Sequence, residues 1–206
     1  MRFTNRQQAG ERLAEELSKF KGKNCAVYAI PRGGVELGRV IADRLEAPLD
    51  LVIVRKIGHP HNPEYAVCVV AEDKHEMCNE GEIASIDKTW LEEAKAKERA
   101  EAVRRRREYL SGRDPVDPAG KTAIVVDDGI ATGMTFIVAL RETRERKPAH
   151  LVAAVPVMPA EFMETLKREC DEVVCLNSDA AYLGAVGAYY GEFPQVSDEA
   201  VKSLMR

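Results

Sequence analysis

The chain of 206 residues has 45% hydrophobic and 31% charged residues and a formal net charge of -4 at pH 7, as is typical of a globular protein. Its length suits one α/β domain over residues 1–206 that buries roughly 70% of its unfolded surface, so no second core is needed. The charge gives no general attraction to nucleic acid, the apolar runs fall short of the ~20 residues of a membrane span, and no secretion signal opens the chain, so we expect a cytoplasmic protein.

An amphipathic helix is predicted at the start of the chain. Asn5 is its expected N-cap, with Gln8 three residues on, and Gly22 closes the segment. Apolar residues recur between them at helical spacing, at Ala9, Leu13, Ala14, Leu17 and Phe20.

Short apolar runs of strand length follow, most of them separated by helix-like stretches. They cover 26–30, 51–54, 123–126, 151–155 and 173–176. Continuous apolarity is typical of strands covered on both faces, so we predict a mainly parallel, twisted sheet flanked by helices. This is a Rossmann-like, doubly wound α/β fold with a core at about 24–176. Leu37, Ile41 and Leu45 mark the first crossover helix, and 134–146 and 160–169 supply later ones.

Two segments depart from this alternation. Prolines interrupt 59–63 before an apolar run resumes at 66–71, which indicates an antiparallel excursion or hairpin. Residues 85–110 then predict a long, very polar helix that lies across the surface. The final segment, 177–206, is an aromatic-rich flap or small hood that ends in a short helix begun near Ser197 or Asp198.

The cysteines and histidines show no metal-binding pattern. There are five cysteines, an odd number without any C-x-x-C pair, which disfavours both a zinc site and a disulfide framework. We therefore expect buried or reduced thiols at Cys25, Cys68, Cys78, Cys170 and Cys175.

The most informative run is 122–135, where an apolar strand leads through adjacent acids, Asp127 and Asp128, into a loop rich in glycine and threonine. The acids can accept hydrogen bonds from sugar hydroxyls or hold hydrated magnesium, and the small residues let backbone amides approach a phosphate at a helix N-terminus. The loop matches neither G-x-x-x-x-G-K-[ST] nor G-x-G-x-x-G. An ordinary turn with an acidic N-cap is the alternative, but it needs fewer of these residues.

A second anion site is predicted after the first strand, where Arg32, Gly33 and Gly34 precede a helix. Arg55 and Lys56 are expected beside it at the end of another core strand. In open parallel sheets the carboxyl ends of the strands form one crevice, so the two loops should face the same ligand.

The order of residues in 122–135 resembles the signature for PRPP (5-phosphoribosyl 1-pyrophosphate) of type I phosphoribosyltransferases. The resemblance extends to 31–34, 54–56, 70–72 and 186–190 and is strongest to a bacterial and archaeal branch of that family. It implies a Mg²⁺-dependent pentosyltransferase that moves 5-phosphoribosyl from PRPP to a nitrogenous acceptor, expected to be a nucleobase, and releases pyrophosphate.

The resemblance also implies residue roles. The 5-phosphate would be bound by Gly129, Ala131, Thr132, Gly133 and Thr135. Pyrophosphate would be bound by Arg32, Gly33, Gly34, Arg55 and Lys56, with a non-proline cis peptide bond after Arg32. Asp127, Asp128 and Lys56 would be catalytic, the two acids holding the ribose hydroxyls and Mg²⁺ directly or through water. Tyr189, Tyr190 and Phe193 would either stack on the acceptor or pack the hood onto the sheet, and 58–65 is the candidate for a mobile covering loop.

Two other functions stay open. The row Arg104, Arg105, Arg106 and Arg107 would suit a regulator that senses PRPP or nucleotides and binds nucleic acid, although Glu101 and Glu108 favour a solvated helix face or a subunit contact. A PRPP-binding protein without an efficient reaction is the third possibility. The polar helix and the flap indicate self-association, with the number of subunits left open.

Overall fold

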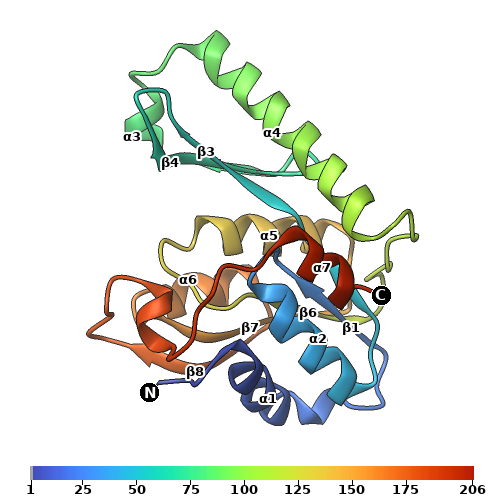
Figure 1. Ribbon diagram of the computed structural model, residues 1–206. Helices are drawn as coiled ribbons and strands as arrows, with labels where there is room; N and C mark the ends of the chain where they lie inside the picture. The colour runs from blue at the N-terminus through green and yellow to red at the C-terminus, as the bar shows by residue number, and fades with distance from the viewer. Residues whose placement is uncertain (1) are drawn as a thin grey trace.

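A five-stranded parallel sheet forms the centre of the protein, as the computed structural model of residues 2–206 shows (Figure 1). Its strand order is β2-β1-β6-β7-β8, and every neighbouring pair is parallel. The predicted doubly wound α/β sheet is therefore confirmed. The strands are β1 (Cys25–Ala29), β2 (Leu49–Leu51), β6 (Thr122–Val126), β7 (His150–Pro159) and β8 (Glu172–Asp179).

Alternate strand residues point to opposite faces of this sheet, and both sets are apolar, so helices cover both faces. Val27 of β1 belongs to a core shared with α1 (Arg6–Glu16) and α2 (Gly34–Leu45). Its neighbour Tyr28 belongs to a second core shared with α5 (Met134–Glu145) and α6 (Phe162–Glu169). The crossover helices predicted from the apolar spacing are all present.

Side-chain caps begin two helices where the sequence predicts them. Asn5 accepts a hydrogen bond from the Gln8 amide at 3.0 Å at the start of α1. Ser197 accepts one from Ala200 at 3.1 Å at the start of α7 (Asp198–Leu204). A short 3-10 helix, η1 (Ser18–Phe20), follows α1.

A second layer, the hairpin lobe (residues 54–109), stands on the sheet at the α5 side (Figure 1). Its antiparallel strands β3 (Val54–His59), β4 (Asn62–Ala71) and β5 (Glu76–Cys78) lie between α5 and the long α4 (Lys88–Tyr109), with α3 (Glu80–Ile83) before α4. Ile57 packs toward Leu91 of α4, whereas Val69 packs toward Val138 of α5. The predicted hairpin and polar helix are confirmed, and the segment 58–65 is the strand-rich hairpin tip instead of an open loop.

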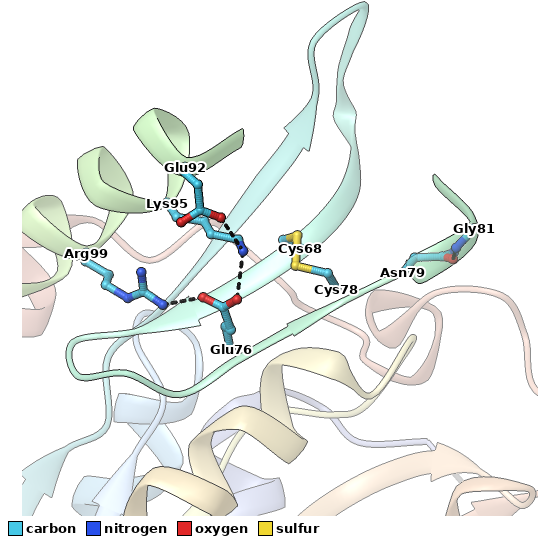
Figure 2. The surroundings of a disulfide bond; sticks show 8 residues. All are labelled: Cys68, Glu76, Cys78, Asn79, Gly81, Glu92, Lys95 and Arg99. Carbon is cyan, nitrogen blue, oxygen red and sulfur yellow. Dashed lines mark hydrogen bonds and ion pairs between the residues drawn. A yellow bond between two sulfur atoms is a disulfide. The ribbon is translucent and has the colours of Figure 1, made fainter. Parts of the chain in front are cut away.

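The lobe also overturns two expectations. Arg55 and Lys56 open antiparallel β3 and do not end a parallel strand, because the parallel strand β2 already stops at Leu51. The prediction that all cysteines are thiols is wrong for Cys68 and Cys78, which form a disulfide between paired positions of β4 and β5 (Figure 2). Strand register brings them together, and their spacing in the sequence carries no sign of it.

An ion-pair cluster lies beside the disulfide and joins β5 to α4 (Figure 2). Lys95 donates to Glu76 at 2.7 Å and to Glu92 at 2.9 Å, and Arg99 also pairs with Glu76. The disulfide therefore ties β5 to β4, and the ion-pair cluster ties it to α4. Cys25 and Cys170 are buried thiols, as predicted, and burial raises the pKa of Cys170 to about 11.

The N-terminal segment pairs with the C-terminal flap beside the sheet. Phe3 donates its amide to the carbonyl of Tyr189 at 2.8 Å and accepts from the amide of Gly191 at 2.8 Å. Tyr189 ends the short helix η2 (Val186–Tyr189) within the predicted C-terminal flap. None of the helices in residues 2–206 combines the length and apolarity that crossing a membrane requires.

Candidate functional site

A cleft of about 540 Å³ opens at the carboxyl ends of β1 and β6. These strands are neighbours, but the chain leaves β1 into α2 on one face of the sheet and leaves β6 into α5 on the other. Such a switch point is where open α/β sheets bind ligands. The loop after β1, the start of β3, the loop after β6 and two tail residues line it: Ile30, Pro31, Arg32, Gly33, Val54, Arg55, Lys56, Asp127, Asp128, Gly129, Ile130, Ala131, Thr132, Gly133, Thr135, Phe136, Val186 and Phe193.

The two acids lie at the centre of this cleft. Asp127 accepts from the backbone amide of Asp128 at 2.8 Å, and Asp128 accepts from Nε of Arg6 at 2.8 Å. Burial raises the pKa of Asp127 well above its usual value, and the charge of Asp128 raises it further. Burial also raises the pKa of Asp128, whereas the Arg6 guanidinium acts in the opposite direction. Burial thus disfavours two negative charges here, and a cation or a hydroxyl donor bound in the cleft would stabilise the charged form of the pair.

The loop after β1 presses directly against the acids. A Cβ atom on Gly34 would lie 2.8 Å from the carbonyl oxygen of Val126, which is too close for a side chain. This contact explains why glycine occupies the first position of α2. The loop contains a non-proline cis peptide bond between Pro31 and Arg32, so the expected cis bond is present but precedes Arg32 instead of following it.

The loop after β6 forms a cradle for an anion at the start of α5. Gly133 precedes the helix with φ +79 and contributes no capping side chain. A Cβ atom there would also lie 2.1 Å from Phe162, so glycine is required for space as well as for conformation. The buried hydroxyl of Thr135 finds no hydrogen-bond partner within residues 2–206 although Thr135 lines the cleft. An unpaired hydroxyl beside free helix amides suits a phosphate.

Cationic side chains from the loop after β1 and from β3 also line the cleft. Lys56 is exposed at the cleft, and Arg55 reaches from β3 to Glu98 of α4 at 2.8 Å. Arg32 lies 3.4 Å from Asp198 at the start of α7. The structure thus brings together all the predicted anion-binding residues except Gly34, which lies behind the cleft wall against β6.

The donor set fits magnesium only together with a ligand. Carboxylate oxygens such as those of Asp127 and Asp128 are the ligands that Mg²⁺ prefers. Across residues 2–206, however, no group of three or more His, Cys, Asp or Glu side chains could hold a metal by itself. Phosphate and hydroxyl oxygens of a bound substrate would have to complete the coordination.

The aromatic residues of the tail divide into two groups. Phe193 lines the cleft together with Val186. Tyr189 and Tyr190 are only 1% and 7% exposed and are not part of the cleft wall. Their hydroxyls donate to Asp179 at 2.7 Å and to the carbonyl of Asp128 at 2.6 Å, so they pack the flap onto the sheet, which is the second of the two roles considered for them.

Arg6 is the site residue that sequence reasoning missed. It is the first residue of α1, it is 5% exposed, and it reaches Asp128 across 122 positions of sequence. No motif surrounds it. A buried arginine almost always has a partner, so its burial would have pointed to a contact. That burial becomes visible only once the fold is known.

Most of the arginine row on α4 forms ion pairs with carboxylates of the protein itself. Arg104 pairs with Glu101 and Glu108, Arg105 pairs with Glu101, and Arg106 is held by Glu72 and by buried Asp50. Three of the four side chains therefore serve ion pairs within the protein. This favours the helix-face interpretation over a nucleic-acid surface.

Comparison with known proteins agrees with this geometry. The family model "Phosphoribosyl transferase domain" matches residues 3–188. Proteins from two strains of Mycobacterium tuberculosis, provisionally named phosphoribosyl transferases, are each 36% identical over 205 residues and 98% of this chain. The chain spans only 46% of the length of these relatives. The crystal structure of TT1426 from Thermus thermophilus is 37% identical, with a TM-score of 0.81 over 100% of this chain and 98% of its own. The chain therefore belongs to the phosphoribosyl transferase domain family.

Proposed function

We propose that the chain is a phosphoribosyltransferase that transfers the 5-phosphoribosyl group of PRPP to a nitrogenous acceptor, with a nucleobase as the expected class, and releases pyrophosphate. One observation carries this proposal. The carboxylates of Asp127 and Asp128 lie in a single cleft between two glycine-containing loops that each precede a helix. PRPP has the matching order of groups, with a phosphate at one end of a polyol and a pyrophosphate at the other.

Different groups of cleft residues would bind different parts of PRPP. Gly129, Ala131, Thr132, Gly133 and Thr135 would bind the 5-phosphate at the N-terminus of α5. Arg32, Gly33, Arg55 and Lys56 would bind the pyrophosphate and stabilise the charge that grows on it as it leaves, whereas Gly34, whose amide donates to Ile30, would support this loop from behind the cleft wall. Asp127 and Asp128 would hold the ribose hydroxyls.

The chemistry is a displacement at the anomeric carbon. The acceptor nitrogen forms a bond to that carbon while the bond to the pyrophosphate oxygen breaks with its electron pair, and the configuration inverts. Mg²⁺, held near Asp127 and Asp128 directly or through water, would supply positive charge that stabilises the leaving pyrophosphate. The chain orients the two reactants and stabilises charge, and Lys56 would provide the cation nearest the departing group.

A pyrophosphate-release assay with PRPP, Mg²⁺ and a panel of purines, pyrimidines and simple amines tests this function. We expect turnover with one acceptor class and a loss of several orders of magnitude in Asp128→Asn. A folded protein that binds PRPP but turns over none of the acceptors would favour the sensing alternative. Near-normal turnover by Asp128→Asn would contradict the residue assignment.

A further inference from the structure

A single buried guanidinium makes three contacts that involve two separate parts of the molecule, the loop after β6 and the C-terminal flap. Nε of Arg6 donates to Oδ2 of Asp128 at 2.8 Å, and its Nη1 donates to the carbonyl of Pro194 at 2.7 Å. The guanidinium carbon also lies 3.8 Å from the ring centroid of Phe193. The first residue of α1 therefore joins the loop after β6 to the C-terminal flap.

The contact with Asp128 fixes one oxygen of the carboxylate and leaves the other available. Oδ2 is bounded on a second side by Gly33, where an added Cβ would lie 1.9 Å away, so this oxygen has no room for a ligand. Oδ1 is then the oxygen that can accept from a ribose hydroxyl. A charge-assisted hydrogen bond in a buried place holds such an orientation more firmly than a neutral one.

The contact with the flap fixes an apolar wall of the same cleft. Phe193 lines the cleft, and the guanidinium covers its ring while binding the next residue's carbonyl. A planar cation stacked on an aromatic face restricts the tilt of the ring. The position of Phe193 and the orientation of Asp128 consequently depend on the same side chain.

We propose that Arg6 is a positioning residue that aligns the ribose-binding carboxylate and the acceptor-facing wall through one guanidinium. This inference rests on the proposed transferase function. It requires that the PRPP side of the cleft, at Asp128, and the acceptor side, at Phe193, are coupled through Arg6. A residue that only stabilised the fold would not show such coupling.

The test compares Arg6→Gln and Arg6→Lys with Arg12→Gln, a control on the same helix whose guanidinium lies 5.7 Å from the Phe3 ring. Calorimetry with PRPP and Mg²⁺ gives the affinity for PRPP, and steady-state kinetics give kcat and both KM values. We expect Arg6→Gln to lower kcat/KM for both substrates roughly 10- to 100-fold while Arg12→Gln stays near wild type. Arg6→Lys keeps a charge for Asp128 but lacks the planar stack, so it should recover PRPP affinity more than acceptor KM.

A double-mutant cycle with Phe193→Leu measures the coupling between Arg6 and Phe193, which is the acceptor-side half of this requirement. If Arg6 positions both sides, the effects of Arg6→Lys and Phe193→Leu on the acceptor KM are not additive. The inference is overturned if Arg6→Lys and Arg6→Gln behave like the Arg12 control, or if the cycle is additive. A wild-type chain that neither binds PRPP nor releases pyrophosphate overturns the proposed function itself, whereas intact wild-type kinetics with unaffected Arg6 variants overturns only the role of Arg6.

Discussion

Gly33 and Asp128 approach so closely that a Cβ atom on Gly33 would lie 1.9 Å from Oδ2 of Asp128. The two residues belong to the loops after β1 and β6, which are 95 positions apart in the chain. The predicted pyrophosphate loop and the predicted ribose-binding acids are thus in direct contact. The absence of a side chain at Gly33 is a condition for that contact.

Gly33→Ala should therefore displace the Asp128 carboxylate from its place against Arg6. We expect PRPP affinity, measured by calorimetry with Mg²⁺, to fall at least 10-fold because a rigid loop cannot move aside at low cost. Gly81→Ala is the matched control, since a Cβ there meets only Asn79 at an ordinary 3.5 Å. Unchanged affinity in Gly33→Ala would show that the loops are free to separate.

Tyr190→Phe tests the role of the flap. The Tyr190 hydroxyl donates to the carbonyl of Asp128 at 2.6 Å from a nearly buried ring, so its removal leaves that carbonyl without this donor. We expect a loss of about 1 kcal/mol in the free energy of unfolding, measured with denaturant. Tyr65→Phe removes a hydroxyl that donates to Glu82 from a ring 45% exposed, and it should cost less. Equal effects of the two variants would contradict this account.

Glu142 should make the free energy of unfolding depend on pH. It is 7% exposed on α5, and one of its oxygens has no hydrogen-bond partner among residues 2–206. Burial, followed by the charges of Glu72 and Asp73, raises its pKa to about 8, and Arg106 and Arg146 only partly oppose this. The folded chain therefore keeps a proton that the unfolded chain releases near pH 4.5.

Because the folded state binds this proton more tightly, the stability that it contributes is present below pH 4.5 and is lost as the pH rises toward 8. In Glu142→Gln this decline should be absent, so its free energy of unfolding at pH 8 should exceed that of the wild type by up to about 4 kcal/mol. Denaturant unfolding between pH 4 and 9 measures it. Glu145→Gln, on the same helix with a side chain 57% exposed, is the control. A parallel pH curve for wild type and Glu142→Gln would refute the assignment.

The disulfide should stabilise the hairpin lobe. Cys68 and Cys78 are 10 positions apart, so the bond that closes this short loop should contribute about 2 to 3 kcal/mol to the free energy of unfolding. Alkylation of the unfolded, unreduced chain should label three cysteines, and after reduction five. Trp90, the only tryptophan, is half-buried against the core of the lobe, and its fluorescence should report earlier unfolding after reduction. A Cys68→Ala/Cys78→Ala variant should show no response to the reductant. Labelling of five cysteines without reduction would disprove the bond.

Local patterns predict much of this fold because local forces decide it. The apolar runs of β1 and β6 and the spacing of Leu37, Ile41 and Leu45 in α2 reflect burial that each segment requires wherever it packs. The acid pair and its glycines are adjacent in the chain, so the anion cradle at α5 is visible in the sequence. The caps at Asn5 and Ser197 depend on neighbours within three residues.

Contacts between distant segments were not predictable in this way. Arg6 reaches Asp128 only after α1 packs beside the sheet, and Cys68 meets Cys78 only in the register of β4 with β5. Arg55 and Lys56 still line the cleft, but from β3, because the chain leaves the parallel sheet after Leu51. The packing role of Tyr189 and Tyr190 depends on how the flap folds onto the sheet and buries their rings, which the sequence does not indicate.

Thermal unfolding with PRPP and Mg²⁺ tests the central claim most directly, namely that the acid pair and the two flanking loops form one PRPP site. At ~100 times the dissociation constant, PRPP should stabilise the wild-type chain by about 2.7 kcal/mol and raise Tm by roughly 5 to 11 °C. Asp128→Asn should lose most of this shift while its ligand-free Tm remains that of a folded protein. No shift in the wild-type chain, or the same shift in Asp128→Asn, would contradict the account.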